Sequence, residues 1–146
     1  MDSIQNNLVA VLNEQLSCAQ AMLSTLAREN QALVEGDPEL LNAASADKAK
    51  LVETLEALEA ERRSLTAAIE TTLTSTEETG SEPKWHSLLQ LIAACKQQNQ
   101  RNGALVKART EQVRMALKLL RGSEAEFYDP SGLTPSSRSA RSLGSA

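Results

Sequence analysis

The chain has 146 residues, of which 41% are hydrophobic and only 2% aromatic, and its formal net charge is −4. Its 22 leucines and 21 alanines far outnumber its 6 valines and 3 isoleucines. This balance favours helices over strands, and the scarcity of aromatic residues argues against a deep small-molecule pocket. We therefore expect one all-α domain whose function lies on its surface.

Glycine and proline mark the ends of the predicted helices. Gly36-Asp37-Pro38 predicts a helix that ends at a glycine, followed by an aspartate N-cap and a proline at the first position of the next helix. The polar stretch 74–83 separates the second helix from the third, and Arg121-Gly122 predicts the end of the third. The sequence thus predicts a helical bundle over residues 1–122, with helices near 3–35, 38–73 and 84–121.

Each predicted helix carries one narrow stripe of apolar residues at a spacing of three and four. Long helices with such stripes bury them only against similar helices. We expect an elongated antiparallel bundle of three long helices, either alone or completed by a second copy of the chain.

Residues 123–146 have a different composition, with seven serines, two prolines and little apolar content. Such a segment gains too little from burial to offset the entropy that ordering costs, so we expect a flexible C-terminal tail. Two of the three aromatic residues of the chain lie in it, in the patch Phe127-Tyr128-Asp129-Pro130.

The third predicted helix is strongly basic, with eight lysines and arginines against one acid, Glu111. Nucleic-acid binding is one interpretation of such a helix, and complementation of its acidic neighbours in the bundle is the other. We favour the second because the chain is acidic overall and no aromatic residues alternate with the basic ones. No nucleic-acid partner is expected.

The sequence offers little for catalysis or metal binding. His86 is the only histidine, and Cys18 and Cys95 lie far apart without the spacing of a zinc site. We expect no enzyme, no cofactor and no metal. The N-terminus does not resemble a signal peptide, and no run of 18 apolar residues is present. The expected location is therefore the cytoplasm, without membrane insertion.

The predicted third helix departs in two places from the single apolar stripe expected of a helix in a simple bundle. Asn99 and Asn102 fall on the apolar stripe, followed by Gly103. A continuous or mildly kinked helix is the favoured interpretation there, with close helix approach and a chain reversal as alternatives. Further on, Leu119 and Leu120 are adjacent and cannot share one narrow stripe. Whether this apolar surface belongs to a wide core, is covered by another segment or is kept for a partner stays open.

Two sets of residues carry a family resemblance, which extends over most of residues 5–132. In both sets of residues this chain resembles the FlgN family of flagellar export chaperones. The downstream set is Trp85, Leu88-Leu89, Cys95, Asn99, Asn102-Gly103, Leu105-Val106, Leu117, Leu120 and Tyr128-Asp129-Pro130-x-Gly132; the upstream set is Leu26, Glu29, Leu33, Asp37-Pro38, Leu41, Lys48, Leu51, Leu55-Glu56, Leu58 and Arg62.

The resemblance implies a cytoplasmic chaperone. Such proteins bind hook-associated proteins, which join hook and filament, before their secretion and deliver them to the flagellar type III export gate. It places client binding in the C-terminal part, at residues that we assign as Val113, Leu117, Leu120 and Phe127. It also assigns the contact with the export gate to Tyr128, although Asp129 follows where relatives often have glycine. The role of the Asn99, Asn102 and Gly103 motif stays undefined.

Two other classes remain as alternatives. One is a structural coiled-coil adaptor that forms a homodimer and has no export client. The weaker one is a helical protein associated with nucleic acid, which a salt-dependent DNA shift would reveal.

Overall fold

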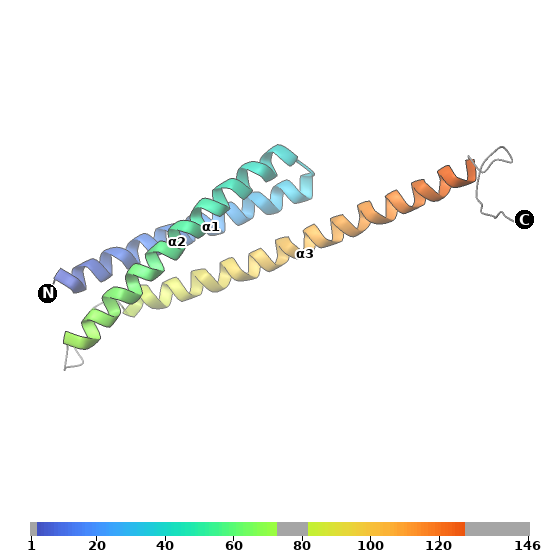
Figure 1. Cartoon of the computed structure of the whole chain (residues 1–146). Coiled ribbons are helices and arrows are strands. Elements are labelled where there is room, and N and C mark those ends of the chain that lie inside the picture. The colour runs from blue at the N-terminus through green and yellow to red at the C-terminus, as the bar shows by residue number, and fades with distance from the viewer. Residues whose placement is uncertain (1–2, 73–81, 128–146) are drawn as a thin grey trace, which may run out of the picture. The chain divides into compact units, whose positions relative to one another are not determined.

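A computed structural model of the chain describes residues 3–72 and 82–127, with the side chains of 123–127 left out. It contains three helices, α1 (Ser3–Glu35), α2 (Pro38–Thr72) and α3 (Glu82–Phe127), joined in this order along the chain (Figure 1). The described residues contain no strand. The all-helical fold predicted from composition and periodicity is confirmed.

The turn between α1 and α2 follows the predicted caps. Gly36 has a φ of 69°, a left-handed conformation that glycine adopts without a Cβ clash. The amide of Asp37 donates to the carbonyl of Ala32 at 3.0 Å, the bond that closes a Schellman cap. The carboxylate of Asp37 accepts from the amide of Leu40 at 3.1 Å, so Asp37 is the N-cap of α2. Pro38 then fills the first helical position, where no amide hydrogen is needed.

The chain divides into two units, Met1–Leu105 and Val106–Ala146, and α3 runs through both. Within the first unit, consecutive helices run in opposite directions, so α1 and the first part of α3 run the same way (Figure 1). Arg28 on α1 pairs with Asp47 on α2 at 2.8 Å. The predicted antiparallel packing of three helices is confirmed.

Most of the core comes from α1, because this helix packs against both α2 and α3. One cluster joins buried residues of α1 to Leu88 of α3, and a second joins α1 to Leu58 of α2. The buried apolar residues on α1 are Leu8, Val11, Leu12, Cys18, Ala19, Met22, Leu26, Ala32 and Leu33. This double contact explains why most of the buried apolar residues lie on α1.

The third helix is longer than the sequence predicts. It begins at Glu82 and continues through Gly122 to Phe127, whereas the prediction ended it at Arg121. The prediction was wrong because one glycine costs a helix only about 1 kcal/mol relative to alanine, which does not stop a long helix. The first residues of the predicted tail are therefore helical, and residues 128–146 lie outside the described residues.

Candidate protein-interaction surfaces

A buried polar group lies at the centre of the packing between α1 and α3. Asn102 is only 1% exposed. Its amide nitrogen donates to the carbonyl of Leu26 at 2.8 Å and to Glu29 Oε1 at 2.9 Å. Its side-chain oxygen accepts from Asn30 at 3.1 Å and from Gln98 at 3.0 Å. Both donors and both acceptor positions of the asparagine are therefore satisfied.

This group extends to α2 through one lysine. The ammonium of Lys48 lies 3.4 Å from the carboxylate of Glu29 and donates to Asn99 Oδ1 at 2.6 Å. We refer to Glu29, Lys48, Asn99 and Asn102 as the polar seam, since they link all three helices along the apolar stripe. A polar group on such a stripe restricts the register in which helices pack. In this structure its contacts connect α3 to both α1 and α2.

Gly103 has no packing role in the structure. The helix continues unbroken through Asn102 and Gly103, and a Cβ built on Gly103 would meet nothing within 4 Å. The expectation of a continuous helix holds, and a close approach of another helix at this glycine does not occur in the first unit.

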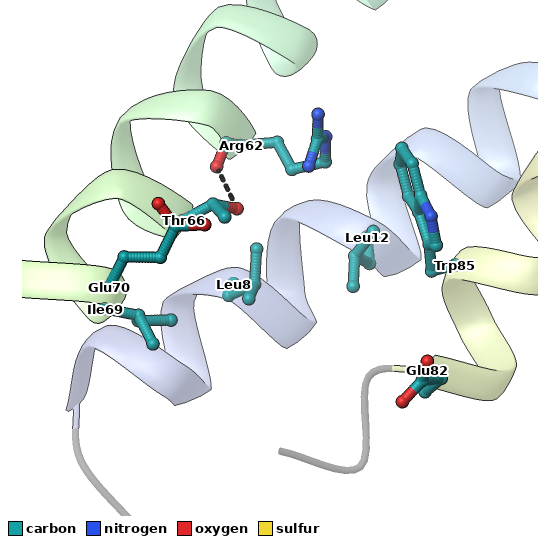
Figure 2. Close-up of a pocket in the computed structure, with 8 residues that line it drawn as sticks. All are labelled: Leu8, Leu12, Arg62, Thr66, Ile69, Glu70, Glu82 and Trp85. Carbon is teal, nitrogen blue, oxygen red and sulfur yellow. Dashed lines mark hydrogen bonds between the residues drawn. The ribbon is translucent and has the colours of Figure 1, made fainter. Parts of the chain in front are cut away.

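An open pocket of about 260 Å³ lies in the first unit, where the start of α1, the end of α2 and the start of α3 meet (Figure 2). The guanidinium of Arg62 stands over the ring of Trp85, 4.3 Å from its centroid. Thr66 is the only hydroxyl among the lining residues, and it donates to the carbonyl of Arg62 at 2.9 Å. The lining residues include no histidine or cysteine. The hydroxyl of the pocket is thus bound to the backbone of its own helix.

Arg62 also determines the ionisation of a neighbouring carboxyl group. Its guanidinium binds Glu59 in a bidentate pair, at 2.7 and 2.9 Å, and Arg63 and Gln15 donate to the same carboxylate. The hydrogen bond from Arg62 is the main reason why the pKa of Glu59 is lowered from 4.5 to about 2. Glu59 therefore stays ionised, and the arrangement stabilises structure rather than transferring protons.

The second unit presents a surface of another kind. Every described residue from Val106 to Gly122 is exposed, including its large apolar side chains. Four of them lie on one side of the helix, because their spacing of seven, four and three keeps them in register. We refer to these four as the C-terminal stripe: Val106 (46% exposed), Val113 (60%), Leu117 (46%) and Leu120 (62%).

The described part of the second unit carries two further large apolar side chains that are exposed, and neither was among the predicted site residues. Met115 is 64% exposed and Leu119 is 73% exposed, and their spacing places them on the side opposite the stripe. The adjacent leucines at 119 and 120 were the signal for this second side.

The structure brings three of the predicted client-binding residues, Val113, Leu117 and Leu120, onto one exposed face. Phe127 is the last residue of α3, and its side chain lies outside the described residues. Tyr128 lies outside them too. Within the described part of the second unit, the side chains of Val113, Leu117 and Leu120 are all exposed.

The remaining residues that could take part in catalysis or metal binding do not form a cluster. His86 is exposed, Cys18 is buried and Cys95 is half-buried, and burial raises the pKa of both thiols. In residues 3–72 and 82–127 no group of metal-binding side chains comes together. None of the helices in these ranges combines the length and the apolar character that a membrane span requires.

Comparison with known proteins identifies the chain. No curated protein and no solved structure matches it significantly. The model of the FlgN family, described as FlgN protein, matches residues 1–136, which is nearly the whole chain. The chain therefore belongs to the FlgN family, whose members are not enzymes but flagellar export chaperones for hook-associated proteins.

Proposed function

We propose that the C-terminal stripe is the surface that holds the hook-associated client. The observation that supports this is its exposure, since soluble proteins seldom leave a row of large apolar side chains uncovered without a binding role. An amphipathic helix of the client would lie along Val113, Leu117 and Leu120, with Phe127 extending the surface. Each buried leucine contributes about 1.5–3 kcal/mol, so a few of them offset the cost of association.

The basic residues beside the stripe favour a client helix of a particular chemistry. Lys107, Arg114, Lys118 and Arg121 each follow a stripe residue directly. A client helix with acidic residues beside its apolar face fits this arrangement best, because opposite charges beside the contact orient the partner.

Delivery to the export gate is the second part of the proposal. The resemblance assigns this contact to Tyr128, which follows the last residue of α3 directly. Client binding and gate binding would then lie next to each other along the chain. A homodimer of the client-free protein is the third part.

The client surface is tested with paired variants on the same helix. Leu117→Asp should weaken binding of a purified hook-associated protein, FlgK or FlgL, by more than about tenfold, because it places a charge in the apolar contact. Leu119→Asp, on the opposite side, should change the Kd by less than about threefold. Both side chains are exposed, so circular dichroism and Tm should stay near those of the unaltered chain. Titration calorimetry that finds equal losses for both variants would refute this location.

The gate contact needs a separate experiment. Tyr128→Ala should keep the client in a pull-down and lose the export gate, because the stripe itself is unaltered. Loss of the client with retention of the gate would reverse the roles that we assign to the stripe and to Tyr128.

A further inference from the structure

The part of α3 in the second unit buries none of its described side chains. Every residue from 106 to 122 is exposed, whereas Asn102, four residues before this range, is 1% exposed. Thr110 donates to the carbonyl of Val106 at 2.9 Å, and Arg114 pairs with Glu111 at 2.7 Å. Both interactions lie within one turn of the same helix, so they require the helix to be formed already. We refer to residues 106–122 as the outer segment.

The outer segment has only a moderate tendency to form a helix by itself. Four of its residues are poor helix formers: Val106, Thr110, Val113 and Gly122. Arg114, Lys118 and Arg121 follow one another at spacings of four and three, which places like charges side by side and destabilises the helix. In proteins most of the stability of a helix comes from packing of its apolar face, and here that face is exposed.

A glycine separates the packed part of α3 from the outer segment. Gly103 directly follows Asn102, which is the last buried residue of α3 among those that the structure describes. A Cβ at Gly103 would meet nothing within 4 Å, and Gly103 does not have a positive φ, so neither close packing nor backbone conformation requires a glycine there. Its physical effect is to weaken the continuation of the helix beyond the polar seam.

We infer that the outer segment folds and unfolds as a local unit, while the part of α3 up to Asn102 stays packed. Segments without buried contacts open at a far smaller free energy than the packed core. The C-terminal stripe is a single face only while the outer segment is helical, because its members come into register through the helical period. Opening of the outer segment therefore takes the stripe apart.

A consequence for binding rests on the proposed function. A client that binds the stripe binds only the helical form, so its apparent affinity is lowered in proportion to the population of that form. Client binding in turn completes the helix. A segment that folds on its partner can adjust to more than one client, such as FlgK and FlgL.

Hydrogen exchange of the full-length protein without client tests the local opening directly. Amides of the outer segment should exchange no more than about a hundredfold more slowly than those of an unstructured chain. Amides near Leu26, which is 1% exposed on α1, should exchange at least about a thousandfold more slowly than those of the outer segment. Outer-segment amides that exchange as slowly as those near Leu26 would overturn the inference.

Two substitutions shift the population of the helix without altering the stripe. Ala108→Gly, at an exposed position on the side away from the stripe, should speed exchange of the outer segment and raise the Kd of purified FlgK, each by up to about fivefold. Gly122→Ala, which has open space around it, should change both in the opposite direction by a similar factor. The control Ala43→Gly makes the same change at an exposed position of α2, and it should leave both within about twofold.

The two readouts separate the inference from the proposed function. Saturating FlgK should slow exchange of the outer segment at least about tenfold. If exchange responds to Ala108→Gly and Gly122→Ala but neither the Kd nor the effect of FlgK does, the local opening is upheld and the proposed client surface is refuted. If Ala43→Gly speeds exchange of the outer segment as much as Ala108→Gly does, the segment opens only together with the bundle and the inference is wrong.

Discussion

Asn102→Ala tests whether the polar seam holds the bundle together. The change removes the four side-chain hydrogen bonds of a residue that is 1% exposed. Asn30 and Gln98 are half-buried, so each can form a hydrogen bond with water in place of the lost one. Glu29 cannot, because it is only 8% exposed, although it keeps Lys48 as a partner.

The expected loss of stability follows from these environments. A buried acceptor left without its donor costs about 1–3 kcal/mol, and the charged Glu29 belongs near the upper end. The carbonyl of Leu26 also loses the hydrogen bond that it accepts from Asn102. Alanine has a better helix propensity than asparagine, and this offsets about 0.5 kcal/mol of the loss of stability. The sum is about 2–3 kcal/mol, which lowers the Tm of a chain of this size by about 5–10 °C.

Urea and thermal unfolding followed by circular dichroism measure this loss. Asn42→Ala is the matched control, because Asn42 is exposed on α2 and has no hydrogen bond within the described residues; it should stay within about 0.5 kcal/mol of the unaltered chain. If Asn102→Ala is as stable as this control, the seam does not contribute to stability and our account of how α3 is positioned is wrong.

Three further substitutions test the core, the ion pairs and the third helix. Leu88→Ala should cost about 2–5 kcal/mol in urea unfolding, because Leu88 is 1% exposed, whereas Leu89→Ala, at 45% exposure, should cost far less. The folded-state pKa of Glu59 lies below its ordinary value, so its contribution to stability is present above pH 4.5 and is lost as the pH falls towards about 2. The unfolding midpoints of the unaltered chain and of Glu59→Gln should therefore converge over that range, and a constant difference would contradict the pairing with Arg62. Gly103→Ala should stabilise the protein by about 1 kcal/mol, since open space surrounds the site; a lower Tm would show a contact that the structure lacks.

Local signals in the sequence were sufficient for the fold. Gly36, Asp37 and Pro38 each have a strong conformational preference, so they predicted the end of α1 and the start of α2 to the residue. The prediction that the third helix ends before Gly122 was wrong, because a glycine is only a weak helix breaker when no cap or proline follows directly. Boundaries are predictable where several residues favour the same turn, and they are not where one residue stands alone.

The site could be predicted only in part. The spacing of Asn99 and Asn102 placed them on the stripe, but their partners depend on which turn of another helix lies opposite. Lys48 on α2 and Glu29 on α1 are adjacent only after the helices have packed. For the same reason, the exposure of Leu117 and Leu120 could not be deduced from a pattern that also fits a wide core.

The position of Glu29 has a consequence for the order in which the bundle assembles. Its carboxylate is neutralised by Lys48, and both residues belong to the α1–α2 hairpin, whose contacts are close in sequence and form early. On the ribosome this hairpin can form before α3 has been synthesised, so the charge is already paired when Asn102 arrives. The last helix then docks onto a prepared acceptor instead of having to bury a bare carboxylate.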